Sequence, residues 1–471
     1  MLFSSTTFLF LFLPAMLLGY YVVLRGMRRA QNLFLLAGSL LFYAWGEPWF
    51  VLVMIASILV NYALGLWAHK IWREHRYPNG VITAALVLNL GLLFVFKYLV
   101  FVLENLELLG FHPVIPVIRL PIGISFFTFQ ALSYVIDVAK GKAPVQRDPF
   151  YVGLYISFFP QLIAGPIVKY ADLARQIDLR RESWSGFSAG AVRFLLGLSK
   201  KVLLSNQLAV VADRAFGLGG GSLSAAYAWL GAFCYTLQIY YDFSGYSDMA
   251  IGLGAMFGFR FRENFNYPYF AVSITDFWRR WHISLSSWFR DYVYIPLGGS
   301  RTGKTVRNLL IVWLLTGLWH GANWTFVAWG LFYFALLCLE KFRGLGAGWP
   351  VWLRRVFTLL MVNFGWVLFR ADDLGSAWRY LLAMLGANGV SSAQAGLFLR
   401  ENAVVLALSV LFMVPLVPWV KEKLSRCRGR LSRILFPVLE LLCALALALL
   451  LLVCICYLVK GTYNPFIYFN F

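Results

Sequence analysis

Two histidines lie in stretches whose other residues are mostly apolar or aromatic, and they are the first candidates for chemistry. One is His320, in the string LTGLWHGANWTFVAWG. Burial disfavours the charged form of imidazole, and a neutral histidine can accept a proton from an attacking hydroxyl or thiol. The same side chain could instead form a structural hydrogen bond across helices. The residues alone leave both interpretations open.

The second histidine, His282, lies among arginines in FWRRWHISLSSWFRDYVYIPLGG. Arg279 and Arg280 precede it, and a guanidinium group matches the geometry of a phosphate, such as that of a coenzyme nucleotide. The arginines are explained equally well as determinants of membrane topology, and His282 as an interfacial histidine on a helix surface. Here too, both the functional and the structural interpretation remain open.

Other motifs in the chain favour structural roles. Asp242 lies in the apolar run YYDFSGYSDMAIG, where an acid must pair, for example with arginines of the following loop. The GFSAG string at 186–190 matches G-x-S-x-G but has no strand before it, so we expect no nucleophile elbow. The glycines at 252, 254 and 258 fit helix packing better than dinucleotide binding. The six cysteines show no metal-ligand spacing, so no metal site is expected.

The composition identifies the scaffold that must position these side chains. Of 471 residues, 61% are hydrophobic and 13% are charged, whereas a soluble globular chain has about 45–50% apolar and about 25% charged residues. Soluble enzymes, disordered proteins and coiled coils are excluded, and a polytopic helical membrane protein is indicated. The net charge of +20 comes from basic residues in short loops. This is the positive-inside pattern rather than a nucleic-acid surface.

The apolar runs predict an all-α bundle of ten through-going spans and two re-entrant elements, with both termini external. The spans are expected at about 7–24, 31–46, 49–68, 81–103, 120–139, 191–216, 225–257, 351–370, 403–420 and 434–459. A glycine turn at 219–221 separates the two spans on either side of it. The run 150–168 contains Pro160, Gly165 and Pro166 and has basic flanks on both sides, so it is expected to be broken or re-entrant.

The basic stretch 258–307 is expected in the cytoplasm. It contains an amphipathic helix that Ser273 would cap, with apolar residues at helical spacing at 277, 281, 285, 288 and 292. A hairpin follows at 308–340 and turns at Gly321-Ala322-Asn323, which leaves His320 at membrane depth. We expect one integral-membrane domain over 1–471, with its motif-bearing core at 119–340.

Several strings occur together in a recognisable order. They are PIGISFFTFQALSYVIDV, FFPQLIAGPIVKY, YYDFSGYSDMAIGLGAMFGFRFRENFNYPY, SITDFWRRWHISLSSWFRDYVYIPLGG, LTGLWHGANWTFVAWG and the terminal FIYFNF at 466–471. Together they resemble the membrane-bound O-acyltransferase (MBOAT) family, and within it the bacterial branch that acetylates alginate and similar exported polysaccharides. The resemblance runs through essentially the whole chain.

The resemblance implies roles for individual residues. His320 matches the family's catalytic histidine, in W-H-G, and His282 matches the second histidine of the branch, in W-R-R-W-H. We name five further residues as candidates for substrate binding: Arg279, Arg280, Asn323, Asp242 and Trp319. The resemblance also implies a tunnel across the membrane, acetyl-CoA as a cytoplasmic thioester donor with no permanently bound cofactor, and a bacterial inner-membrane location. An external SGNH-type acetyltransferase and a polysaccharide export machinery are the implied partners, and the terminal FIYF-type tail belongs to the transfer machinery in related branches.

Other functions are compatible with the same pattern. Within the acyltransferases, the acceptor could be peptidoglycan, or the reaction could be D-alanyl transfer to teichoic acid. A transporter is a different class that also uses broken helices and buried charges, although no repeated halves occur here. A non-catalytic scaffold of a polymer-export complex would tolerate replacement of His320. The sequence does not separate a general base at His320 from a transient acyl-histidine.

Overall fold

The computed structural model describes residues 1–218, 222–426, 430–461 and 463–467, and every regular element within these ranges is a helix. The all-α class is therefore confirmed. The predicted turn at 219–221, Cys427 and the last four residues of the terminal string lie outside the described residues. Contacts divide the chain into two compact units, one of residues 1–194 with 247–262 and one of residues 195–246 with 263–471. The prediction of a single membrane domain stays a prediction.

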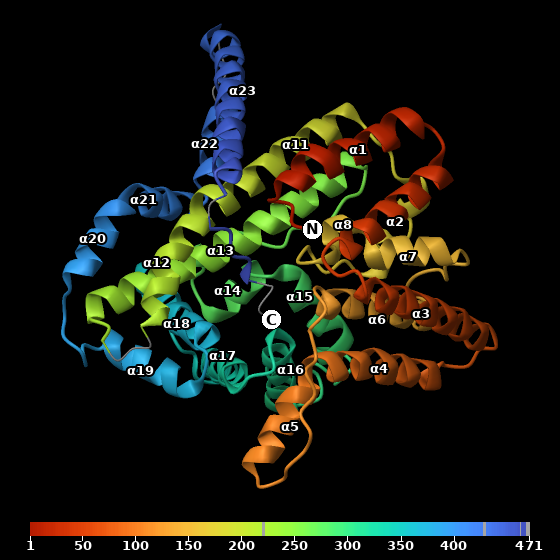
Figure 1. Cartoon of the computed structure of the whole chain (residues 1–471), viewed down its shortest axis with the longest axis horizontal. Helices are drawn as coiled ribbons and strands as arrows, with labels where there is room; N and C mark the ends of the chain where they lie inside the picture. Colours follow the sequence, from red (N-terminus) through yellow and green to blue (C-terminus); the bar gives the residue numbers. More distant parts are fainter. Residues whose placement is uncertain (219–221, 427–429, 462, 468–471) are drawn as a thin grey trace. The chain divides into compact units, whose positions relative to one another are not determined.

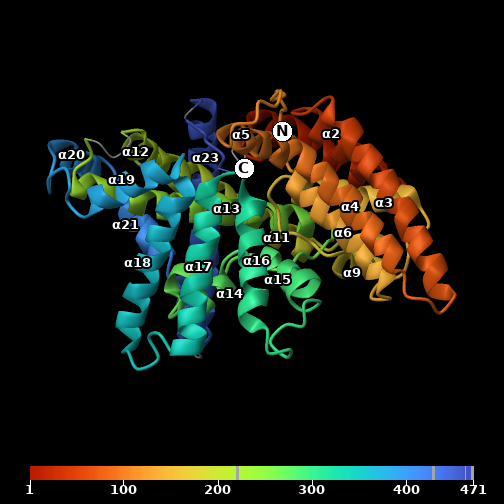
Figure 2. The same ribbon diagram turned by 90° about the horizontal axis from the view of Figure 1, so that it is seen from below.

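The first unit is built around a helix that is buried on every side. All sixteen residues of α6 are buried, and α3, α4 and α7 pack on it; α3, α4 and α6 lie side by side (Figure 2). A helix that is apolar all round belongs in a core. The helices wholly within this unit are η1 Phe8–Phe12, α1 Leu13–Leu18, η2 Gly19–Val23, α2 Arg28–Ala44, α3 Phe50–Arg73, α4 Asn79–Leu93, η3 Phe94–Tyr98, α5 Leu99–Leu108, α6 Ile124–Ala139, α7 Pro149–Ser157, α8 Phe159–Leu162, α9 Tyr170–Leu173 and α10 Gln176–Leu179.

Two long helical rods run from one unit of the chain into the other. The first comprises α11 Trp184–Ser199, η4 Lys200–Ser205 and α12 Asn206–Gly217, and the second is α13 Ala225–Met256. Gly190 and Gly252 bring their backbones together, since a Cβ on Gly252 would lie 2.5 Å from the Gly190 carbonyl oxygen. GFSAG therefore lies inside a helix, and Gly252 serves helix packing, as the sequence indicates.

The second unit contains the predicted hairpin. Helices α16 and α17 form it and turn through residues 321–323, and α16, α17 and α18 lie side by side (Figures 1 and 2). The remaining helices of this unit are η5 Pro268–Phe270, α14 Ile274–Arg280, α15 Ile283–Phe289, η6 Arg290–Tyr294, α16 Thr305–His320, α17 Trp324–Arg343, α18 Val351–Arg370, α19 Leu374–Met384, α20 Ala393–Glu401, α21 Ala403–Phe412, α22 Leu416–Arg426 and α23 Arg430–Val459.

Among the described residues, six helices are long and apolar enough to cross a membrane, or seven if α20 and α21, bent by 63°, count as one span. The predicted count of ten is thus not confirmed. The apolar helices Phe8–Val23 and Ile124–Ala139 are shorter than a full span. The run 150–168 is broken between α7 and α8, as predicted. The prediction of one helix over 403–420 is wrong: α21 ends at Phe412 and α22 begins at Leu416, because Pro415 lacks the N–H that would continue the helical hydrogen bonds and disfavours the helical conformation of the residue before it.

We predict opposite effects of adding a methyl group to two helical glycines. A Cβ on Gly330 of α17 would lie 2.5 Å from the Trp313 carbonyl oxygen of α16, whereas a Cβ on Gly91 of α4 meets no atom within 4 Å. Gly330→Ala should lower stability by about 1–3 kcal/mol through overpacking, and Gly91→Ala should raise it by about 0.5–1 kcal/mol through helix propensity. Thermal unfolding of both purified variants in detergent checks this. An unchanged midpoint for Gly330→Ala would contradict the close packing of the hairpin.

Candidate active site

The backbone breaks at His282, where the sequence predicts a continuous amphipathic helix. Ser273 does cap the first part, because its hydroxyl accepts a hydrogen bond from Asp276 N at 3.0 Å. However, α14 ends at Arg280, Trp281 is extended, and His282 adopts a left-handed conformation with φ +44° before α15 begins. The prediction of one helix is therefore wrong. A non-glycine residue with this φ is strained and needs its surroundings to hold it.

The side chain of Asn264 holds this break. Its Oδ1 accepts hydrogen bonds from Ser284 N at 3.1 Å and from Ser284 Oγ at 2.9 Å, and it lies 3.2 Å from His282 Nδ1. The Asn264 backbone carbonyl also accepts from Ile283 N at 3.0 Å. Asn264 and His282 are both buried. Since the oxygen that meets Ser284 N can only accept, His282 Nδ1 must carry the proton.

This arrangement sets the state of the His282 ring. With Nδ1 protonated, Nε2 carries the lone pair, and no hydrogen-bond partner for Nε2 lies within the described parts of the chain. Burial lowers the pKa of His282 to about 3, so the ring is neutral at physiological pH. Phe243 packs edge-on against it, with ring centroids 4.6 Å apart. His282 is thus a buried, oriented hydrogen-bond acceptor.

Trp319 connects the two histidines. Its ring centroid lies 5.9 Å from that of His282 and 4.9 Å from that of His320, so the two imidazoles are separated by no more than the sum of these distances. His320 ends α16 and is 5% exposed. Trp329 and Phe369 pack edge-on against its ring, at 5.2 and 5.0 Å between centroids. The structure therefore brings His282, His320 and Trp319 into one aromatic, water-poor site.

Glu340 of α17 fixes α14 to the hairpin that carries His320. Its two carboxylate oxygens accept hydrogen bonds from Ile274 N at 2.5 Å, Thr275 N at 2.9 Å and Thr275 Oγ1 at 2.7 Å. A carboxylate satisfies the unpaired N–H groups at a helix start and complements the helix dipole. Trp278 adds ring contacts to Trp313 of α16 and Tyr333 of α17, both at 4.9 Å. These bonds set the position of His282 relative to His320.

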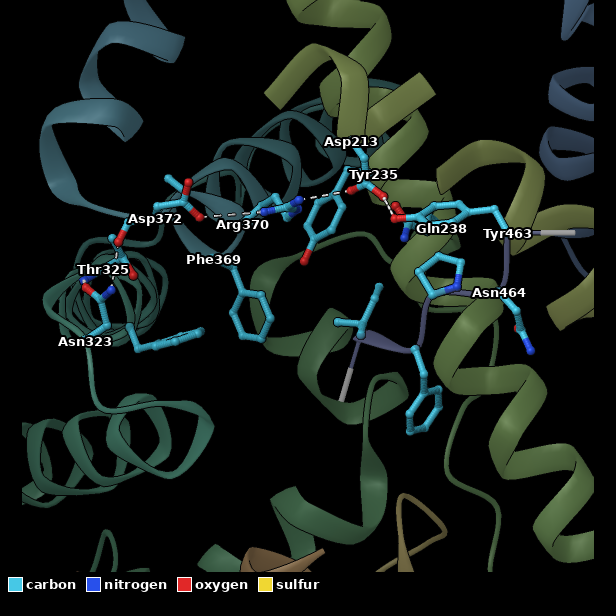
Figure 3. Close-up of a pocket in the computed structure, with 15 residues that line it drawn as sticks. Asp213, Tyr235, Gln238, Asn323, Thr325, Phe369, Arg370, Asp372, Tyr463 and Asn464 are labelled. Atoms are coloured by element: carbon cyan, nitrogen blue, oxygen red, sulfur yellow. Dashed lines mark hydrogen bonds and ion pairs between the residues drawn. The ribbon is translucent and has the colours of Figure 1, made fainter. Parts of the chain in front are cut away.

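A cavity of about 690 Å³ lies in the second unit (Figure 3). Phe369 lines this cavity and also contacts the His320 ring. Arg370 lies in the cavity wall between Asp213, at 3.0 Å, and Asp372, at 3.9 Å. Five of the fifteen lining residues belong to the C-terminal segment 463–467. A tunnel that crosses the membrane stays a prediction.

The other predicted site residues have structural contacts. Asn323 lines the cavity and caps α17, since its side chain accepts from Thr325 N at 3.0 Å and donates to the Asp372 carbonyl at 2.8 Å. Asp242 pairs with Lys201, with 2.6 Å between charged atoms, rather than with an arginine of the following loop. Arg280 pairs with Asp276 at 2.8 Å, and Arg279 is exposed on the same helix. Their roles in substrate binding stay predictions.

Asn264 and Glu340 hold the site together but are not predictable from the sequence. Asn264 lies in FRENFNYPY, eighteen residues before His282. The sequence around an asparagine in a loop does not indicate which hydrogen-bond donors its side chain binds. Glu340 occupies the basic end of an apolar helix, where an acid is unremarkable. Only the folded geometry shows that both bind backbone N–H groups around the histidine segment.

The chain resembles known acyltransferases in sequence. The model of the MBOAT, membrane-bound O-acyltransferase, family matches residues 142–345. A probable alginate O-acetylase AlgI of Azotobacter vinelandii is 46% identical over 393 residues, which cover 82% of this chain and 78% of the relative. A peptidoglycan O-acetyltransferase of Helicobacter pylori is 36% identical over 457 residues, with 88% and 86% covered.

A teichoic acid D-alanyltransferase of Bacillus subtilis is more distant, at 27% identity over 281 residues, which cover 53% of this chain and 68% of the relative. The family model spans His282, His320 and Trp319, and it ends just beyond Glu340. The chain is thus an O-acyltransferase that belongs to the membrane-bound O-acyltransferase family, in its AlgI-like branch.

Proposed function

We propose that this protein moves an acetyl group from a cytoplasmic thioester, acetyl-CoA, across the membrane for O-acetylation of an exported polysaccharide of the alginate type. The main support is that two buried imidazoles, those of His282 and His320, both contact the Trp319 ring, and that His320 also contacts Phe369, which lines a cavity, in a chain of this family. The alginate O-acetylases at 45–46% identity support the choice of acetyl group and polymer.

His320 is the proposed general base. Its imidazole takes the proton of the acceptor hydroxyl while the hydroxyl oxygen attacks the thioester carbonyl. The C–S bond breaks, an ester forms, and the proton passes from the imidazolium to the leaving thiolate, so the base is regenerated. The apolar rings around His320 strengthen the electrostatic interactions of the charges that develop. The alternative is a covalent step, in which the imidazole itself attacks the carbonyl and then passes the acyl group to the acceptor.

His282 is proposed to orient a reactant or to shuttle a proton. Its Nε2 lone pair can accept a hydrogen bond from an acceptor hydroxyl or from a water, while Asn264 keeps Nδ1 protonated. To orient a reactant, the ring does not need to change charge, whereas a proton shuttle would pass through a transient imidazolium. We therefore regard Asn264 as a positioning residue, which acts through His282.

The proposal places the donor and the acceptor on opposite sides of the membrane. Arg279 is exposed on α14, and its guanidinium is suited to the phosphates of acetyl-CoA. On the outside, an SGNH-type acetyltransferase and the polysaccharide export machinery would receive the acetyl group. This requires the bacterial inner membrane with both chain termini external, as the loop charges predict.

A second acceptor class is peptidoglycan, which the relative at 36% identity favours. Measuring esters on both the exported polysaccharide and the cell wall separates these two acceptors. A scaffold or transporter role would leave ester formation independent of His320.

We predict that His320→Ala lowers O-acetylation of the exported polymer by about 10²- to 10⁴-fold, because the general base is lost. The measurement is ester content per polymer mass at equal protein level in the membrane. His112→Ala, on an exposed loop residue, is the control and should have wild-type ester content. Normal ester content in His320→Ala would remove His320 as the catalyst.

We predict that Asn264→Ala lowers transfer by about 10- to 100-fold, equivalent to about 1–3 kcal/mol, because three buried donors lose their acceptor. Asn264→Asp keeps an acceptor oxygen and should retain more activity than Asn264→Ala. The neighbouring Asn266 is exposed, so Asn266→Ala serves as the matched control. Initial rates of the purified variants with acetyl-CoA check this order, and equal rates for Asn264→Ala and Asn266→Ala would refute the positioning role.

A further inference from the structure

A buried ion pair in the second unit has no part in the reaction described so far. Lys201 of η4 and Asp242 of α13 lie 2.6 Å apart, and their side chains are 2% and 1% exposed. Burying two charges costs several kcal/mol of solvation for each ion. Such a pair is tolerated only where further hydrogen bonds satisfy it, so its other partners indicate what it serves.

Those partners are backbone atoms of the C-terminal segment. Lys201 Nζ donates to the Pro465 carbonyl oxygen, and Asp242 Oδ2 accepts from Ile467 N at 3.0 Å. The cation thus meets a backbone acceptor, and the carboxylate meets a backbone donor two residues later. Hydrogen bonds to charged groups are about twice as strong as those between neutral groups. The pair therefore holds the path of the main chain at 465–467.

Contacts of neighbouring side chains hold the same segment. The Phe466 ring lies 5.1 Å from the Tyr246 ring and 5.7 Å from Lys201 Nζ. Asn206 donates to the Asn464 side-chain oxygen at 3.1 Å, and the Tyr463 hydroxyl donates to Asp213 at 2.9 Å. The segment is thus fixed at several points to the two rods that carry Lys201 and Asp242.

The held segment forms a wall of the cavity that Phe369 lines. Residues 463–467 line it together with Phe326 and Phe369 (Figure 3). Of these side chains, Phe369 packs its ring on the His320 ring. If the segment moved away, this wall would open and water would reach the aromatic site. Excluding water is what gives the buried histidines their strength as catalysts.

We propose that Lys201 and Asp242 are a positioning pair that holds the C-terminal segment 463–467 as a wall of the cavity that Phe369 lines, and that acyl transfer requires the segment there. The requirement for acyl transfer rests on the proposed function, whereas the anchoring of the segment does not. The pair does not touch the reacting atoms. It acts through the backbone of the tail.

The test replaces both charges at once, as Lys201→Met with Asp242→Leu, so that neither charge is left buried alone. The matched control is Arg193→Met with Asp248→Leu. That pair is 2.9 Å apart and joins the same two rods to each other. Hydrogen exchange of the C-terminal peptide, in full-length protein in nanodiscs, reports on the Ile467 amide. Acetyl transfer from acetyl-CoA is measured on the same samples.

We expect exchange at the Ile467 amide to rise at least tenfold and transfer to fall at least tenfold in the Lys201–Asp242 variant, with both near wild type in the control. Unchanged exchange would overturn the anchor. Raised exchange with normal transfer would overturn the requirement for the tail. A chain ending at residue 462 keeps the pair and lacks the segment, so it must also lose transfer, and normal transfer in it would contradict the proposal. Exchange needs no turnover, so a wild-type protein inactive with acetyl-CoA would reject the proposed function while the anchor result stands.

Discussion

The geometry of the chain around His282 depends on the hydrogen bonds that the carboxamide oxygen of Asn264 accepts. This oxygen binds the Ser284 backbone, the Ser284 hydroxyl and the His282 ring at once. Those bonds offset the strain of a left-handed residue, about 1–3 kcal/mol, in a segment whose apolar spacing otherwise suits one continuous helix. The same oxygen decides which nitrogen of His282 carries the proton. One buried acceptor therefore fixes both the break in the backbone at His282 and the tautomer of the His282 ring.

The remaining contacts bring that segment to His320. The Glu340 carboxylate accepts hydrogen bonds from the first backbone N–H groups of α14. Glycines let α16 and α17 pack closely, and Trp319 and His320 lie at the turn between these two helices. The Trp319 ring then contacts both imidazoles. In an apolar bundle each polar group must be satisfied by the protein, and here the groups that satisfy the backbone also position the histidines.

The sequence predicts the large features of the fold well, because they follow from long apolar runs and strong local signals. The hairpin with its turn at 321–323, the break within 150–168 and the Ser273 cap are all confirmed. Helical spacing in the segment after Ser273 gave the wrong answer, since the hydrogen bonds from Asn264, distant in sequence, outweigh local periodicity. The partner of Asp242 was also unpredictable, because Lys201 is forty-one residues earlier and the third participant is a tail near residue 467. The residue type shows that burying a polar side chain is energetically unfavourable. Which hydrogen-bond partner offsets that cost follows only from the fold.

We propose that His282 and His320 face one reaction centre. A cryo-EM structure of the full-length protein with a non-hydrolysable thioether analogue of acetyl-CoA tests this arrangement. We expect the carbonyl carbon of the analogue to lie about 3–3.5 Å from the His320 imidazole and against Trp319. An analogue whose carbonyl lies out of contact with both histidines would contradict it.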